Sequence, residues 1–560
     1  MASHSSKRKT IIYQLFPRLL MPQRREQKTG GTIDENGCGK LGDITPTVLR
    51  RIRRLGASHV WFTGIIRHAT ATDYSAYGIP KQDPHIVKGK AGSPYAIADY
   101  YDVDPDLATN VDLRMKEWQS LVARTHKAGL KIVIDFVPNH VARQYRSIAA
   151  PKGVCNLGEN DDTTCAFAPD NNFYYLPHQC FAPDFPIGTY HEEPARATGN
   201  DQFHAHPTMN DWYDTVKLNY GCPPLCTQLA PVGADGAVPA TWTAMLYILR
   251  FWAQQGVDAF RCDMVHMVPL AFWQWVIPLM HKEFPHVDFI AEVYDEGMYR
   301  PLLQAGFSML YDKVGLYDTL IAICRQQWST HDITRCWQRT DDIAEHMLAF
   351  IENHDEQRVA SKQLLDSAEA ALPAMLVALC LRNSPAMIYA GQEVGEQGDE
   401  KEGYSQGDGR TTIYDYWCVE SLQRTFFQRR KLTRKQRRLE QCYQQMLNLV
   451  NTQPALSEGR MFDLMYVNPH INRQFAFFRQ HGSQLLLCIA NFNVQPATIS
   501  LHIPNHAIEW LGIKEHIYQA HDLLNDTDTP ITLHIQADKA IEISTIAYGT
   551  HVFQLMTDGE

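Results

Sequence analysis

The chain has 560 residues, of which 45% are hydrophobic and 20% charged, and its formal net charge is −10. This composition is typical of a soluble globular protein and excludes a disordered chain, a collagen and a long coiled coil. The length allows several domains, or fewer where one of them is an α/β barrel. The acidic balance argues against a nucleic-acid-binding protein, which normally carries an excess of basic residues.

The first 25 residues combine basic side chains with an apolar run at residues 11–16, as a secretion signal does. Gln14, Pro17 and Arg18 interrupt that run, and no small-residue cleavage site follows, so we interpret it as the first strand of the fold. No window holds the roughly 18 consecutive apolar residues of a transmembrane helix. We therefore expect a cytoplasmic protein without membrane contact.

Short β-rich apolar runs alternate with helix-period segments along the first 450 residues. Residues 46–55 illustrate a helix start, with Thr45 as the N-cap and Pro46 in the first turn. Further helices are predicted at residues 111–128, 241–255 and 272–284. Strands are predicted at residues 11–16, 59–63, 131–136, 257–261, 287–293, 308–311, 347–351 and 386–389.

Eight strands alternating with helices predict an α/β fold with a parallel sheet, and the count favours a closed (β/α)8 TIM barrel over a doubly wound sheet. The barrel is predicted to comprise residues 1–140 and 240–452. A long irregular segment, residues 141–239, interrupts it after the third strand. From residue 453 the pattern becomes alternating without long helices, which predicts a separate C-terminal antiparallel β-sandwich at residues 453–560.

Charged and polar residues follow several of the predicted strands, where a barrel places its active site. Asp135 ends one strand, and Arg261 and Asp263 lie two residues apart, so that their side chains share one side of the next strand. An arginine beside a carboxylate favours its ionised form, which a nucleophile requires. Each pattern alone also fits a structural hydrogen bond or a plain buried ion pair.

Two further strands end in the same way. Glu292 follows an apolar run, which suits a general acid, and His354 and Asp355 follow the strand predicted at residues 347–351. The spacing of Asp263, Glu292 and Asp355 corresponds to whole β/α units. A convergent set of carboxylates without metal-ligand spacing is typical of glycoside hydrolysis.

In the segments around these strand ends, the sequence resembles glycoside hydrolase family 13, the α-amylase family. Four segments match its signature regions in order: Asp135-Phe-Val-Pro-Asn-His140, Gly256-Val-Asp-Ala-Phe-Arg-Cys-Asp263, Ile290-Ala-Glu-Val293 and Glu352-Asn-His-Asp355. The segments Ile12-Tyr-Gln-Leu-Phe16 and Gly391-Gln-Glu393 match as well. The resemblance covers residues 11–450, and it identifies residues 141–239 with the inserted B domain of that family.

The resemblance implies roles for individual residues. Asp263 would attack the anomeric carbon, Glu292 would act as acid and base, and Asp355 would stabilise the transition state. The implied substrate-binding residues are Arg261, which orients the nucleophile, together with His140, His354 and Tyr95. No cofactor is implied for the chemistry itself.

The sequence leaves open whether the chain binds the structural calcium ion of the family. Asn139 matches a common calcium ligand of the family, whereas His266 and Met267 replace the Lys-His pair that usually follows the nucleophile. This replacement also leaves open whether the chain cleaves starch internally.

We therefore predict a retaining hydrolase that cleaves α-1,4-glucosidic bonds of starch, maltodextrins or related oligosaccharides. A transglycosidase of the same family is the nearest alternative, because both reactions share the covalent intermediate. A noncatalytic sugar-binding relative is disfavoured because all three carboxylates are present. A metal-dependent barrel hydrolase is disfavoured because Arg261 beside Asp263 would repel a cation.

Overall fold

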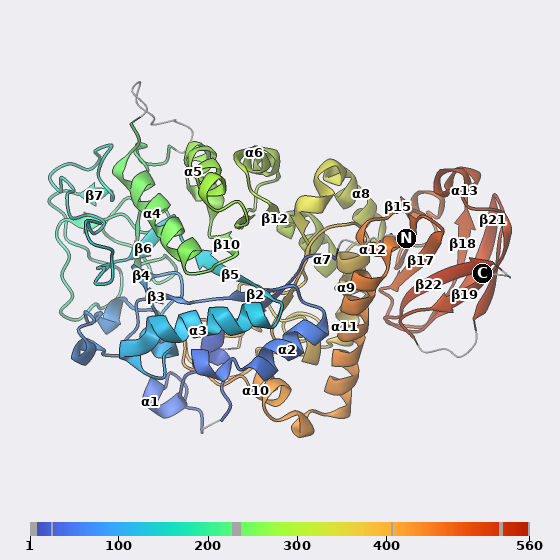
Figure 1. The fold of residues 1–560 in the computed structure, drawn as a ribbon, viewed down its shortest axis with the longest axis horizontal. Coiled ribbons are helices and arrows are strands. Elements are labelled where there is room, and N and C mark those ends of the chain that lie inside the picture. The colour runs from blue at the N-terminus through green and yellow to red at the C-terminus, as the bar shows by residue number, and fades with distance from the viewer. Residues whose placement is uncertain (1–7, 24–25, 227–236, 405–406, 526–529, 558–560) are drawn as a thin grey trace.

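The computed structural model describes residues 8–23, 26–226, 237–404, 407–525 and 530–557. Residues 227–236, part of the predicted inserted segment, lie outside the described residues. Figure 1 shows three regions in a row: the inserted segment at one end, a barrel of strands and helices in the centre, and a β-rich C-terminal region at the other end. No helix in the part of the chain that the structure describes is both long and apolar enough to cross a membrane.

Eight parallel strands form the central sheet, in the order β13-β12-β11-β10-β5-β2-β1-β14. Their bounds are β1 Ile11–Leu15, β2 His59–Phe62, β5 Lys131–Phe136, β10 Ala259–Cys262, β11 Asp288–Ala291, β12 Met309–Tyr311, β13 Met347–Leu348 and β14 Ala386–Tyr389. Nearly every residue in them is buried, as expected of parallel strands covered on both faces. All eight predicted strands are confirmed, with ends shifted by a few residues.

The two outer strands of this order meet and close the sheet. A parallel bridge joins Ala349, just after β13, to Ala386 at the start of β14. The backbone N–H of Ala349 donates to the carbonyl of Pro385 at 2.9 Å, and that of Met387 donates to the carbonyl of Ala349 at 2.9 Å. The sheet is therefore a closed barrel, as the strand count predicted, and not a doubly wound sheet.

Helices cover the outside of the barrel. In α2, Thr45 caps the N-terminus by accepting a hydrogen bond from the N–H of Val48, and Gly56 ends the helix with φ +125°. A Cβ on Gly56 would lie 2.8 Å from that of Leu447, so this close approach also requires glycine. The main helices are α2 Pro46–Leu55, α3 Arg114–Lys127, α4 Ala240–Gln254, α5 Leu270–Glu283, α6 Tyr299–Ala305, α7 Asp318–Cys324, α8 His331–Arg339, α9 Leu372–Cys380, α10 Glu420–Phe426 and α11 Arg434–Thr452.

The inserted segment lies between β5 and α4, and its described residues form only short strands. Strand β6 (His140–Ala142) pairs antiparallel with β9 (Thr215–Lys217), and β7 (Tyr175–Leu176) pairs with β8 (Ala195–Arg196). Because only three residues separate the end of β5 from the start of β6, the insertion starts at the rim of the barrel. Its first and last strands therefore bring residues 139–142 and 215–217 beside the strand ends.

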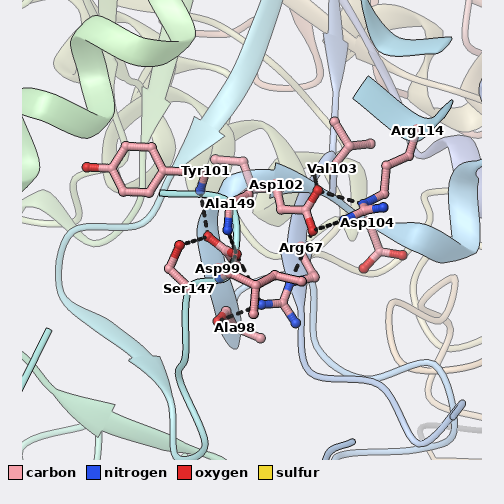
Figure 2. Close-up of polar contacts among 12 residues, drawn as sticks. Arg67, Ala98, Asp99, Tyr101, Asp102, Val103, Asp104, Arg114, Ser147 and Ala149 are labelled. Atoms are coloured by element: carbon pink, nitrogen blue, oxygen red, sulfur yellow. Dashed lines mark hydrogen bonds and ion pairs between the residues drawn. The ribbon is translucent and has the colours of Figure 1, made fainter. Parts of the chain in front are cut away.

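A buried charge network ties this segment to the loop after β2, which forms the hairpin of β3 (Ile66–His68) and β4 (Ile97–Val103). Figure 2 shows Arg67 between Asp99 and Asp102, at 3.2 and 3.5 Å. Asp99 also accepts hydrogen bonds from the hydroxyl of Ser147 at 2.6 Å and from the N–H of Ala149 at 3.2 Å. Arg114 pairs with Asp102 at 2.7 Å, so the two carboxylates of this network face two guanidiniums. The network therefore fixes the base of the insertion against the hairpin.

The C-terminal region is an antiparallel β-sandwich, as predicted. Its larger sheet has the order β15-β16-β17-β22-β19-β20, and β18 pairs with β21 in the smaller one. Arg479, on β16, connects the sandwich to the barrel by donating to the carbonyl of Leu381, at the end of α9, at 2.7 Å. The strands are β15 Arg460–Asp463, β16 Gln474–His481, β17 Gln484–Asn491, β18 Ala497–Ile503, β19 His516–Asp522, β20 Ile531–Ile535, β21 Lys539–Thr545 and β22 Thr550–Thr557.

Candidate active site

The carboxyl ends of the barrel strands surround a cavity of about 210 Å³. Asp263 directly follows β10, Glu292 directly follows β11, and Asp355 lies on the segment after β13. The backbone continues the ladder at both strand ends, since Asp263 N–H donates to the carbonyl of Phe136 and Glu292 N–H to that of Cys262. The cavity is lined by Lys88, Ser93, Tyr95, His140, Trp212, Asp214, Thr215, Asp263, Met264, Glu292, Tyr294, Asp355, Ile413 and Tyr414.

Arg261, on β10, lies at the centre of the carboxylates and is 1% exposed. Its Nη1 is 2.7 Å from Asp263 Oδ1 and 3.5 Å from Asp135 Oδ1. Its Nη2 is 2.7 Å from Glu292 Oε1 and 4.0 Å from Asp355 Oδ2. One guanidinium therefore brings together carboxylates from four separate strand ends.

Burial and mutual repulsion raise the pKa values of three of these carboxyls, those of Asp135, Asp263 and Asp355. Burial is the largest cause for Asp263, whose pKa lies well above its usual range, and the charge of Glu292 raises it further against the opposing effect of Arg261. The same causes raise the pKa of Asp355 to about 7, although 38% of its side-chain surface is exposed. Our expectation that Arg261 alone keeps Asp263 ionised omitted burial and the neighbouring carboxylate.

His354 and Tyr95 form one wall of the site. Gln14 Nε2 donates to His354 Nδ1 at 2.8 Å, so the other ring nitrogen, Nε2, carries the proton. This Nε2 lies 3.1 Å from Asp355 Oδ2 and also contacts the hydroxyl of Tyr95. The rings of Tyr95 and His354 stack with centroids 5.3 Å apart. His354 thus directs an N–H toward Asp355.

His140, the first residue of β6, also lines the cavity. Burial, followed by the charges of Lys217 and Lys88, lowers its pKa to about 3, so its ring is neutral at ordinary pH. Its ring centroid lies 5.1 Å from that of Trp212. The structure thus places every predicted catalytic and substrate-binding residue, Arg261 included, in or directly against one cavity.

Asn139 does not present the free oxygen that a calcium ligand needs. Its Oδ1 accepts a hydrogen bond from Lys217 Nζ at 2.5 Å, and its Nδ2 donates to the carbonyl of Gly199 at 2.8 Å. A calcium ion bound to this Oδ1 would lie against the Lys217 ammonium, which repels it. The residues around Asn139 therefore do not form a site for the structural calcium ion of the family.

Several residues of the site were not identified from the sequence. The Tyr294 hydroxyl donates to Glu292 Oε1 at 2.6 Å, and the N–H of Met264 donates to Glu292 Oε2 at 2.7 Å. Tyr294 lies two residues after Glu292, so its alternation with Glu292 could have indicated it. Trp212 and Tyr414 come from irregular segments, where no periodic signal predicts which side chains face the cavity.

The arrangement is suited to acid–base and nucleophilic chemistry at a buried carboxylate pair. The space between the carboxylates is filled by the Arg261 guanidinium, which would repel a bound metal ion. Within the described residues, no three His, Cys, Asp or Glu side chains are grouped as metal ligands.

Comparison with known proteins agrees with this geometry. The family model of the alpha amylase catalytic domain matches residues 20–289. The alpha-1,4-glucan:maltose-1-phosphate maltosyltransferase of Corynebacterium glutamicum is 25% identical over 308 residues, which cover 53% of this chain and 34% of that protein. The α-amylase MalA of Haloarcula japonica is 23% identical over 398 residues, or 70% of this chain and 44% of that protein.

The chain thus spans less than half the length of these curated relatives. Among solved structures, the maltogenic α-amylase AmyB of Thermotoga neapolitana has the same fold, with a TM-score of 0.63, 18% identity and 98% coverage of each chain. The α-amylase of Geobacillus thermoleovorans complexed with acarbose has a TM-score of 0.63 at 15% identity, again with 98% coverage of each chain. The motifs, the barrel and the family match together identify residues 20–289 as an alpha amylase catalytic domain, the domain of glycoside hydrolase family 13.

Proposed function

We propose that this protein is a retaining glycoside hydrolase that cleaves α-1,4-glucosidic bonds in starch-type oligosaccharides. The observation that carries the proposal is the shared contact of Asp263 and Glu292 with one guanidinium, each at 2.7 Å. Because a guanidinium is small and planar, two carboxyls held by it are close neighbours. This supports the separation of about 5–5.5 Å that a retaining mechanism uses, rather than the wider inverting separation.

In the proposed reaction, Asp263 attacks the anomeric carbon while Glu292 transfers a proton to the departing glycosidic oxygen. The bond between Asp263 and the sugar forms as the glycosidic bond breaks. Glu292 then removes a proton from an incoming water, which displaces Asp263 and regenerates both groups. Asp355, His140 and His354 lie where they can donate to or accept from the hydroxyls of the same sugar ring.

The charge of the site supports this division of roles. Asp263, Glu292 and Asp355 face a single guanidinium, so the cluster holds fewer negative charges than carboxyls near neutral pH. A proton retained within the cluster is what a general acid delivers. The neutral ring of His140 adds no charge that would oppose the positive character of the transition state.

The lining of the cavity suggests what it binds. Trp212, Tyr95 and Tyr414 offer aromatic faces to a sugar ring. The solved relative from Geobacillus thermoleovorans is described in complex with acarbose, and another, AmyP, in complex with maltose. We therefore propose an α-glucan as the substrate.

A glucan transferase of the same family is the second candidate. The relative from Corynebacterium glutamicum that matches 53% of this chain is named a maltosyltransferase. Transfer and hydrolysis differ only in whether a sugar hydroxyl or water displaces Asp263.

Product analysis on maltoheptaose separates the two. A hydrolase releases only shorter maltooligosaccharides, and Glu292→Gln removes this activity. Products longer than the substrate would establish the transferase, and an inactive wild-type protein would contradict both. A variant with Asp170→Asn, an exposed carboxylate of the inserted segment, serves as the control and is expected to keep wild-type activity.

A further inference from the structure

A buried ammonium lies where the inserted segment meets the barrel. Lys217, the last residue of β9, is 7% exposed. Its Nζ donates to Asn139 Oδ1 at 2.5 Å and to the carbonyl of Met267 at 3.1 Å, and it pairs with Asp201 Oδ1 at 2.8 Å. The three acceptors match the three N–H groups of a lysine.

The three acceptors come from three separate parts of the chain. Asn139 lies between β5 and β6, Asp201 lies in a turn of the inserted segment, and Met267 ends the turn η7 (Val265–Met267) that follows the nucleophile. An amide oxygen, a carboxylate and a backbone carbonyl are the oxygen types that calcium prefers. Here they converge on an ammonium instead.

We propose that Lys217 is a built-in cation that replaces a structural calcium ion at this junction. Its positive charge satisfies the oxygens that would otherwise hold a metal, and it leaves no site for one. The folded protein is then independent of calcium at this position. This inference concerns the junction itself and does not depend on which sugar the active site binds.

Lys217 also acts on the active site as a positioning residue, through Asn139. Because a lysine only donates, the contact orients the Asn139 oxygen toward Lys217 and leaves its Nδ2 to donate to His140 Nδ1 at 3.0 Å. His140 Nδ1 must then accept, so its proton lies on Nε2. The lysine thereby sets the tautomer of a histidine that lines the cavity.

The contact of Lys217 with Met267 holds the segment that follows β10, residues 263–267, which contains Asp263. Met264, three residues before Met267, has φ +46° and directs its N–H at Glu292. That backbone conformation is costly for a residue with a side chain, so it must be held by its surroundings. Lys217 supplies one of the contacts that hold this segment.

The first test needs no variant. The wild-type protein is expected to keep its melting temperature and its kcat on maltoheptaose when EDTA is added, and calcium chloride is expected to change neither. A wild-type protein that loses stability in EDTA and regains it with calcium would overturn the proposal.

Two substitutions separate the charge of Lys217 from its volume. Lys217→Met keeps the length without the charge, and we expect a 10–100-fold loss of kcat/KM, a lower melting temperature and no response to calcium. Lys217→Ala empties the position between the three oxygens. This variant is expected to bind calcium, or terbium read by its luminescence, and to regain part of the lost melting temperature.

Lys9→Ala is the matched control. Lys9 is also buried, and its Nζ donates to the carbonyls of Leu379 and Arg382, outside the junction. It is expected to lower the melting temperature without creating a terbium site. Nitrogen NMR of His140, assigned with His140→Gln, should report the Nε2–H tautomer in wild type and its loss in Lys217→Met.

A folded Lys217→Ala that binds no terbium, or a Lys217→Met with wild-type stability and kcat/KM, would overturn the replacement. If Lys217→Ala does not fold, Asp201→Asn takes its place and is expected to lower the melting temperature without calcium rescue. Metal binding, melting and NMR are read without substrate, so an error in the proposed function cannot be mistaken for an error here.

Discussion

Two buried cations organise the region around the candidate active site, and their surroundings differ. Arg261 faces four carboxylates, from Asp135, Asp263, Glu292 and Asp355, within 4.0 Å. Lys217 faces one carboxylate and two uncharged oxygens within 3.1 Å. The first cluster carries excess negative charge, whereas the second is balanced.

The difference distinguishes a reactive cluster from a structural one. A balanced buried ion cluster keeps its groups in one protonation state and holds the backbone in place. An unbalanced cluster must retain protons, and it can release or take them up when a substrate enters. We therefore expect changes at Arg261 and its carboxylates to alter catalysis most, and changes at Lys217 to alter the geometry that supports it.

The largest effect is expected from Asp263→Asn. Loss of the proposed nucleophile should lower kcat by on the order of 10⁴-fold. The same change removes one negative charge from the crowded cluster, so the melting temperature should stay equal or rise. Asp201→Asn, in the balanced cluster, should do the reverse, with a lower melting temperature and a smaller loss of activity. Equal changes of melting temperature in both variants would contradict the proposed difference in charge balance between the two clusters.

Arg261→Met should have the next largest effect. It leaves the carboxylates without their cation, and breaking a buried ion pair in this way costs about 3–5 kcal/mol. Because the uncompensated carboxyls then bind protons more readily, the loss of melting temperature should be smaller at pH 5 than at pH 8. Adding Asp263→Asn to Arg261→Met should restore part of the stability, and purely additive melting shifts would argue against coupling.

The contrast also explains which parts of the site could be predicted from the sequence. Asp263, Glu292 and Asp355 are recognisable because each follows an apolar run that reads as a strand, and strand ends of a barrel converge. The contact of Lys217 with Asn139 joins residues 78 positions apart. No local pattern connects them, because the chain between forms irregular structure whose path depends on tertiary contacts.

The ends of strands were also hard to predict from the sequence. The strand predicted at residues 347–351 is paired over Met347–Leu348 and at the single bridge of Ala349, yet residues 350–351 are equally buried. An apolar run indicates burial, but it does not indicate where the hydrogen-bonded ladder ends. Helix α2 was predicted to the residue, and its N-cap Thr45 and its first-turn Pro46 are local signals.

The pH dependence of activity and stability should run in opposite directions. Burial raises the pKa of Asp355 to about 7 and that of Asp135 to about 6, and it raises that of Asp263 as well. Because Asp355 takes up a proton over this range, and because a protonated Asp263 cannot attack, kcat/KM should fall as the pH is lowered from 7 to 5. Carboxyls whose pKa is higher in the folded than in the unfolded protein favour folding at low pH, and this contribution is lost as the pH rises toward 7. A kcat/KM that stays constant down to pH 5 would contradict the raised values, and Asp355→Asn should flatten part of the stability profile.

The smallest effect is expected from removing one hydroxyl that contacts the reactive cluster. Tyr294→Phe deletes the hydrogen bond to Glu292, and a bond to a charged group is worth about 1.5–3 kcal/mol, so kcat/KM should fall by roughly 10-fold or somewhat more. The melting temperature should change little, because the tyrosine ring stays in place. Tyr299→Phe is a matched control five residues later, since the Tyr299 hydroxyl is buried without a hydrogen-bond partner among the described residues. Removing a buried hydroxyl that lacks a partner costs no hydrogen bond, so Tyr299→Phe should keep wild-type kcat/KM and melt at the same temperature or higher. If both variants lose activity equally, the Tyr294 hydroxyl does not act through Glu292, and the reactive cluster is confined to Arg261 and its carboxylates.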